Sequence, residues 1–268
     1  MSSATVENLA GYDLGSHTHA YTESDAILFA LAVGAGREEL RWVYEQDLRV
    51  MPTFGMALGL WAVRASGATG AYDPVKTLHV GQRLRVHRPL PASATLEMSG
   101  TVAAVWDKGS AALVEVLVSS DYFDATYSIF VPGMGGFGGE RGAAQPAPEA
   151  VDAEEQKLRV QTTESQAALY RLTGDLHPIH IDPGVAQANG FERPILHGLC
   201  TLACVVKAVA DADADGDLEA IEELAARFSG PVFPGDAIEA KARRGEETIV
   251  FAAETDGKVV LKDAWIRF

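Results

Sequence analysis

The sequence predicts an α+β protein in which an antiparallel sheet wraps a buried helix twice, once in each half of the chain. A segment rich in glycine, alanine and proline at 132–150 divides the 268 residues almost in half. Each half contains an apolar helical run and strand-like runs, and a faint repeat, Pro89–Glu97 and Pro231–Glu239, introduces strands in both. A helix and a sheet that bury their apolar faces against each other form the α+β arrangement.

The first half begins with a helical run at Asp25–Val33, for which Ser24 is the expected N-cap because its hydroxyl can accept from a free backbone N–H. A second apolar run, Thr53–Val63, contains Gly55 and Gly59. Each glycine weakens a helix by about 1 kcal/mol, so we expect a looser helix there. Alternating apolar and polar residues then predict three strands, at Thr95–Val105, Ala111–Ser119 and Tyr122–Val131.

The second half repeats this order with a more regular helix. Leu199–Ala212 is apolar nearly all round, which predicts a buried helix. Cys200 and Cys204 lie one turn apart in it and are expected to be buried, reduced thiols. Three further strands are predicted at Ala237–Arg243, Thr248–Glu254 and Lys258–Phe268. The expected boundaries are 1–141 for the first half, 142–160 for a linker and 161–268 for the second half.

Charge and composition exclude several classes of partner. The net charge is −15, and the most basic run, Arg83–Arg88, alternates with apolar residues as one face of a strand would. No basic patch of the kind that binds nucleic acid is visible. No apolar span of 18 residues predicts a membrane helix. The N-terminus lacks the pattern of a signal peptide, and the C-terminal Trp265–Phe268 is not a peroxisomal Ser-Lys-Leu address, so a cytoplasmic location is expected.

The chemistry is concentrated in residues 170–201. Asp175 and His180 are a carboxylate and an imidazole separated by Pro178, which restricts the backbone between them. Gly198 stands at the expected helix start, where backbone N–H groups are free and carry partial positive charge. Asp182 and Pro183 predict the start of a short helix. These parts can polarise a carbonyl group while a carboxylate and an imidazole hold and activate a water molecule.

Each of these residues also has a plainer interpretation. Asp175 can simply close a turn, and His180 can be a structural histidine. Asp175, His177, His180, Asp182 and His197 offer oxygen and nitrogen ligands suited to zinc or iron. Their spacing matches no standard closed zinc site, so no metal is expected.

The two runs that carry the chemistry closely resemble a known family motif. YRLTGDLHPIHID at 170–182 and GFERPILHGLCT at 190–201 resemble the hydratase 2 family of (R)-specific 2-enoyl-CoA hydratases. That family is related to the MaoC-like dehydratases and includes the hydratase part of peroxisomal multifunctional enzyme type 2. The resemblance covers nearly the whole chain and implies a double hotdog fold with one active site in the C-terminal half. It extends in the first half to Ser24–Ala35, Pro52–Gly55, Leu78 and His79, Asp107–Ser110 and Gly135–Gly139.

The resemblance implies roles for individual residues. Asp175 and His180 match the catalytic dyad, and Gly198 matches the residue whose N–H binds the thioester oxygen. It also implies that the loose helix at 52–59 leaves room for a long or bulky acyl group, and that the glycine-rich run at 135–139 lines the site. Residues matching substrate contacts are His79, Val80, Lys108, His177, Pro178 and Phe228.

Two residues depart from the family motif. His177 stands where the motif usually has asparagine, which either preserves a supporting hydrogen bond or alters the pH profile. Val80 stands where the family usually has glycine, so a side chain is added at the position whose backbone matches a substrate contact in the family.

The activity that the resemblance implies is reversible hydration of a trans-2-enoyl-CoA to the (3R)-3-hydroxyacyl-CoA. Coenzyme A is part of the substrate, so no separate cofactor is implied, and the family favours a homodimer. Alternatives are dehydration of 3-hydroxyacyl chains on acyl carrier protein, non-catalytic acyl-CoA binding and metal-dependent hydrolysis. The identity of the acyl group stays open.

Overall fold

A computed structural model describes residues 5–142, 148, 152–213 and 217–268. Within these residues no helix has both the length and the apolar character needed to cross a membrane. The α-helices are α1 Glu23–Ala32, α2 Leu40–Val43, α3 Phe54–Leu58, α4 Trp61–Ala68, α5 Gln166–Tyr170, α6 Pro183–Ala188 and α7 Gly198–Ala212. The strands are β1 Asp13–Tyr21, β2 Leu78–Val86, β3 Ala94–Asp107, β4 Ala111–Ser120, β5 Phe123–Pro132, β6 Gln156–Gln161, β7 Glu223–Phe228, β8 Ala237–Arg244, β9 Thr248–Thr255 and β10 Lys258–Arg267. Short 3-10 helices are η1 Val6–Asn8, η2 Pro74–Lys76, η3 Arg171–Thr173, η4 Pro178–His180 and η5 Leu218–Ala220.

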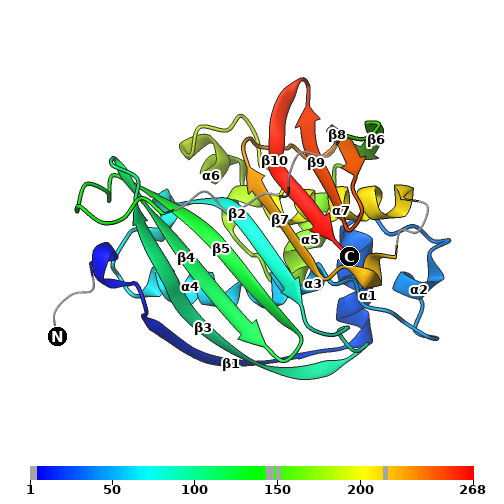
Figure 1. The fold of residues 1–268 in the computed structure, drawn as a ribbon, viewed down its shortest axis with the longest axis horizontal. Coiled ribbons are helices and arrows are strands. Elements are labelled where there is room, and N and C mark those ends of the chain that lie inside the picture. Colours follow the sequence, from blue (N-terminus) through cyan, green and yellow to red (C-terminus); the bar gives the residue numbers. More distant parts are fainter. Residues whose placement is uncertain (1–4, 143–147, 149–151, 214–216) are drawn as a thin grey trace.

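The strands of the described residues form one antiparallel sheet in the order β1-β3-β4-β5-β2-β7-β10-β9-β8-β6 (Figure 1). Counted outward from the β2–β7 junction, each half adds its second, fifth, fourth, third and first strand. The faint sequence repeat is therefore a structural repeat. The predicted α+β class is confirmed, with the difference that the two expected sheets are joined. β2 and β7 pair from Gly81 opposite Arg227 to Arg85 opposite Glu223.

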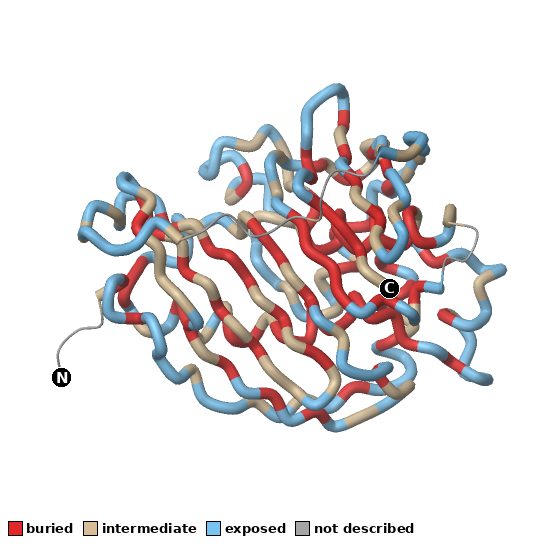
Figure 2. The backbone as a smooth tube through the Cα atoms, viewed as in Figure 1, coloured by how far each residue is buried: buried red, intermediate tan, exposed pale blue. Residues whose placement is uncertain are grey.

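The helix of the second half is buried, as its composition predicts. Eleven of the fifteen residues of α7 are buried, and the helix lies with α5 on one face of the sheet (Figures 1 and 2). Cys200 and Cys204 are free, buried thiols. Lys207 of α7 is also mostly buried, and its Nζ pairs with Glu39 of the first half at 2.8 Å and with Asp211 at 2.6 Å. This helix therefore links the halves as well as filling the second one.

The looser helix predicted in the first half is confirmed, because α3 ends at Leu58 and α4 begins at Trp61. Its glycines serve close packing. A Cβ atom added to Gly59 would lie 2.5 Å from Tyr127 Oη, and one added to Gly55 would lie 3.1 Å from the Phe123 ring. Aromatic rings of β5 fill the space directly beside these two glycines, and the room for an acyl group implied around 52–59 stays a prediction.

Replacing Gly59 with alanine is expected to destabilise the protein by about 1–3 kcal/mol, because the added methyl group must displace the Tyr127 hydroxyl, which donates to the Met56 carbonyl at 2.6 Å. Denaturant unfolding measures the change. Gly36→Ala is the matched control, since a Cβ atom there meets only Glu39 Oε2, at 3.5 Å. Equal stability of the two variants would contradict the packing argument.

Two predicted boundaries differ from the structure. Helix α1 is capped by Thr22 instead of Ser24, because Asp25 Oδ2 accepts from the Thr22 N–H at 2.8 Å and closes a capping box. Strand β6 includes residues 156–160, the last five of the expected linker. Residues 143–147 and 149–151 of that linker lie outside the described residues.

Candidate active site

A short irregular segment between α5 and α7 carries the predicted dyad. After η3, Gly174 adopts a φ of 127°, a backbone conformation that favours glycine, and the chain turns there into Asp175. Pro178 then begins η4, which ends at His180. The predicted start of the next helix is confirmed, since Asp182 Oδ1 accepts from the Gly184 N–H at 2.7 Å. Local turn chemistry thus places the carboxylate and the imidazole.

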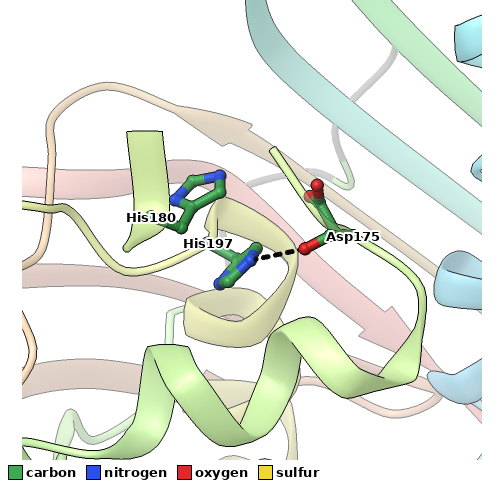
Figure 3. A group of neighbouring side chains, drawn as sticks. All are labelled: Asp175, His180 and His197. Atoms are coloured by element: carbon green, nitrogen blue, oxygen red, sulfur yellow. Dashed lines mark hydrogen bonds between the residues drawn. The ribbon is translucent and has the colours of Figure 1, made fainter. Parts of the chain in front are cut away.

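Asp175 and His180 lie close together, with His197 beside them (Figure 3). One carboxylate oxygen of Asp175 and one ring nitrogen of each histidine lie within 4.8 Å of one another. Two hydrogen bonds of about 2.8 Å that meet at one water molecule span about this distance. The separation between Asp175 and His180 therefore suits a single bridging water.

The hydrogen bonding of His180 determines which ring nitrogen can act. Its Nδ1 lies 2.9 Å from the Ile195 carbonyl oxygen. Because a carbonyl only accepts, Nδ1 carries the hydrogen and Nε2 presents its lone pair. Burial lowers the pKa of His180, and the Asp175 carboxylate opposes that shift only in part. The side chain is thus a neutral base near pH 7, and its Nε2 has no hydrogen-bond partner in the described residues.

Gly198 is the first residue of α7, so its N–H lacks a partner within the helix and stands at the positive end of a 15-residue helix dipole. The Phe228 ring packs on it, because a Cβ atom at Gly198 would lie 3.3 Å from that ring. The His79 ring meets the Phe228 ring edge to face at 5.0 Å. His79 of β2, Phe228 of β7 and Gly198 of α7, all predicted site residues, therefore lie in one contiguous group.

His79 and Val80 occupy an irregular point of β2. His79 pairs with Ile129 and Gly81 pairs with Ser128, so Val80 is the extra residue of a β-bulge. Its φ is negative, and valine is accommodated there without backbone strain. Burial lowers the pKa of His79 to about 4, and its Nε2 bonds to the Gly81 carbonyl at 2.9 Å. The bulge re-aims the strand next to Phe228.

Lys108 lies in the β3–β4 turn, where its Nζ donates to the Arg141 carbonyl. The neighbouring Asp107 carboxylate accepts from the Gly136 and Gly138 N–H groups at 2.9 and 2.8 Å. The glycine-rich run therefore folds onto this turn. Among the described residues no hydrogen bond or ion pair joins the turn to the dyad, so the coenzyme A contact at Lys108 stays a prediction.

His177, the unusual residue of the motif, caps the short helix that contains Pro178. Its Nδ1 accepts from the Ile179 N–H at 3.2 Å, and its own N–H donates to Asp175 Oδ1 at 3.2 Å. An asparagine oxygen can accept in the same way. Histidine therefore preserves the local support that asparagine would provide, while its exposed ring lies 6.1 Å from the His180 ring.

Two contacts of the segment were not predicted. Arg64 of α4 donates to the Gly174 carbonyl at 3.1 Å, so the first half helps to hold the dyad. His197 bonds to the Asp175 carbonyl and stacks on His180. A signal for His197 was its position next to Gly198 in the motif. Nothing in the sequence pairs Arg64 with a residue 110 positions away.

The arrangement of the two stacked histidines is unfavourable for a shared metal ion. The His180 and His197 rings lie 3.7 Å apart with an interplanar angle of 26°. Each imidazole nitrogen presents its lone pair in the plane of its ring, so nearly parallel rings direct their lone pairs side by side. One ion cannot readily lie in both planes at ordinary bond length.

Comparison with known families gives two matches that together cover most of the chain. Residues 19–132 match the MFE-2 hydratase 2 N-terminal domain, and residues 147–264 match the MaoC like domain. The division between these matches falls in the same glycine-rich region that separates the two halves.

Three relatives are each 35% identical to the chain. The match to peroxisomal multifunctional enzyme type 2 of Mus musculus covers 96% of this chain, which spans only 37% of that enzyme's length. The match to 3-hydroxyacyl-thioester dehydratase Y of Mycobacterium tuberculosis covers 92% of this chain and 93% of that protein. Enoyl-CoA hydratase 2, peroxisomal, of Arabidopsis thaliana is matched over 86% of this chain and 84% of its own length.

Solved structures agree in fold. A MaoC-like dehydratase from Phytophthora capsici superposes with a TM-score of 0.86 at 24% identity, over 98% of this chain and 97% of that one. A Mycobacterium tuberculosis protein described as having a double hotdog fold superposes with a TM-score of 0.63 at 15% identity, over 98% and 97%. The predicted double hotdog fold is confirmed. Because relatives with 35% identity are matched over most of their own length, the chain belongs to the MaoC-like hydratase 2 family, the enoyl-CoA hydratases and 3-hydroxyacyl-thioester dehydratases, and is a hydro-lyase.

Proposed function

We propose that this protein catalyses the reversible hydration of trans-2-enoyl-CoA to (3R)-3-hydroxyacyl-CoA. The observation that carries the proposal is the approach of an Asp175 carboxylate oxygen to a His180 ring nitrogen within 4.8 Å, beside His197, which leads directly into the helix start at Gly198. A water activator and an oxyanion donor are the two parts that hydration of a conjugated thioester needs. Membership of the hydratase 2 family supports the same conclusion.

In the proposed reaction, the Gly198 N–H donates to the thioester oxygen and makes Cβ electrophilic. A water molecule donates one hydrogen bond to the Asp175 carboxylate and the other to His180 Nε2. His180 takes a proton as the water oxygen bonds to Cβ, and the π electrons move to the thioester oxygen as an enolate. The imidazolium then delivers the proton to Cα, which restores the thioester and the neutral base.

The same parts serve the reverse reaction, because each proton transfer and each bond is reversible. Starting from the hydroxyacyl thioester, His180 removes the Cα proton and returns it to the leaving hydroxyl group. The direction is then set by substrate and product concentrations. We therefore assign both hydratase and dehydratase activity to one site, with coenzyme A as the carrier.

Acyl carrier protein is the alternative carrier. That partner is itself acidic, and a net charge of −15 on this chain opposes its approach. Comparison of kcat/KM for the same acyl group on coenzyme A and on carrier protein distinguishes the two carriers.

Homodimer assembly and a cytoplasmic location stay predictions.

The direct test uses the purified chain with trans-2-enoyl-CoAs of C4 to C16 and with branched enoyl-CoAs. We expect loss of the conjugated-thioester absorbance and formation of the (3R) alcohol, insensitive to chelators. An (S) product would overturn the stereochemical assignment. Acyl-CoA binding without any turnover would support the non-catalytic alternative, and inhibition by chelators would support a metal-dependent enzyme.

A further inference from the structure

His197 is the residue at this site whose side chain the proposed reaction does not use. It directly precedes α7 and is only 1% exposed. One face of its ring stacks on His180 at 3.7 Å, and the Tyr170 ring lies 4.9 Å away at a tilt of 50°. A histidine enclosed in this way is fixed in orientation, so its hydrogen bonds are part of the site's geometry.

The tautomer of His197 follows from the one hydrogen bond that its side chain makes within the described part of the chain. Its Nε2 lies 3.1 Å from the backbone oxygen of Asp175 (Figure 3). Since a carbonyl oxygen can only accept, Nε2 carries the hydrogen. Nδ1 is buried and has no hydrogen-bond partner among the residues that the structure describes. A second N–H there would be a buried donor without an acceptor, which disfavours the charged ring.

On balance, the environment of His197 lowers its pKa and favours the neutral ring. Burial is the main cause that lowers the pKa of His197, and His180 and Arg171 lower it further. Asp175 opposes them, through its charge and its backbone carbonyl. The ring is therefore neutral near pH 7, and it adds no positive charge beside the imidazolium that forms on His180.

His197 also connects the parts of the site. Its side chain holds the backbone of Asp175, its ring supports the plane of His180, and its backbone leads directly into Gly198. A shift in this one residue changes the distance between the two members of the dyad and their position relative to the oxyanion donor. Misplacement of reacting groups by about 1 Å can cost about 10²-fold in rate.

We propose that His197 is a positioning residue for hydration, in which the hydrogen bond from its neutral Nε2–H to the Asp175 carbonyl is the main constraint and the stacking of its ring on His180 is a smaller one. This inference rests on the proposed hydratase activity. It assigns His197 no proton transfer and no contact with the substrate.

Two substitutions separate the hydrogen bond from the ring. His197→Phe keeps a flat ring without a donor, and His197→Gln keeps an amide N–H at about the reach of Nε2. With trans-2-enoyl-CoA, we expect the Phe variant to lose about 10²-fold in kcat with KM within about threefold of wild type. The Gln variant should recover most of that loss, with a wild-type pH profile of kcat. A Phe variant with kcat within threefold of wild type, or a Gln variant as impaired as Phe, would overturn the proposal.

Val205→Ala is the control for general damage to α7, because Val205 is fully buried in the same helix. It should lower the unfolding temperature and leave kcat within about twofold. Nitrogen-detected NMR of the wild-type histidines supplies a readout independent of turnover. His197 should stay a neutral Nε2–H tautomer from pH 5 to 9, and titration within that range would refute the assigned state. Absence of hydration by the wild type would instead refute the proposed function.

Discussion

Replacing Asp175 with asparagine is expected to lower kcat for enoyl-CoA hydration by about 10²–10⁴-fold, with little change in the free energy of unfolding. The amide keeps the shape of the carboxylate and an oxygen that can accept from the His177 N–H. It lacks the negative charge that orients the water and stabilises the His180 imidazolium. The loss should therefore fall on kcat, measured with saturating trans-2-enoyl-CoA.

Asp182→Asn is the matched control, because it makes the same chemical change seven residues further along the segment. Asp182 caps α6, and asparagine caps a helix about as well as aspartate. Its activity should be close to that of the wild type. Near-normal turnover by the Asp175 variant would remove this residue from the mechanism.

His180→Ala should lower kcat to a similar extent, because Nε2 is the proposed proton carrier. The double variant with Asp175→Asn should be little worse than the more impaired single variant, since groups that act on one water do not contribute independently. Single-turnover measurements can check this. Fully multiplicative losses would contradict a shared water.

Acidification is expected to reduce the stability of the folded protein between about pH 6.5 and pH 4. Burial lowers the folded-state pKa values of His79, His180 and His197 below 6.5, to about 4 for His79. In this window the unfolded chain binds more protons than the folded chain, so the free energy of unfolding falls as the pH falls. Protonation of His79 alone should lower the free energy of unfolding by about 2 kcal/mol over this window, a figure already reduced for the partial exposure of its ring.

Denaturant unfolding at intervals from pH 7 to pH 4.5 measures this dependence. His79→Gln removes one titrating group and should flatten the slope, with the two proteins approaching each other in stability as the pH falls. A slope unchanged by the substitution would show that His79 titrates alike in the folded and unfolded states. Carboxylates that titrate in both the wild type and the His79→Gln variant contribute equally to the two slopes, so their contribution cancels in the comparison.

The proximity of Asp175 and His180 could be predicted because the geometry of this segment is largely local. Asp175, Pro178 and His180 lie within six consecutive residues, and the hydrogen bonds that cap the segment come from side chains two or three positions away. The buried helix α7 and the predicted strands follow from hydrophobic periodicity, which the adjacent chain displays directly. Such features depend on neighbours that the sequence places side by side.

The packing of the first half could not be predicted in the same way. Gly55 and Gly59 do break the helix, as expected from their low helix propensity. Their contacts with Phe123 and Tyr127 depend on how β5 lies across the helix, almost 70 residues further along the chain. Propensity indicates that a helix is weak, and only packing shows whether the freed space is open or filled.

The sequence by itself determined the α+β class, the internal repeat and the family motif around the dyad, because periodicity, caps and spacing act over a few residues. Only the tertiary structure decided that β2 and β7 join the two half-sheets, that Arg64 reaches the Gly174 carbonyl, and that His197 holds Asp175. The physical reason is that strand pairing and side-chain hydrogen bonds across the core depend on the three-dimensional approach of distant segments. Many alternating strands can pair in principle, and the packing of the whole molecule selects one arrangement.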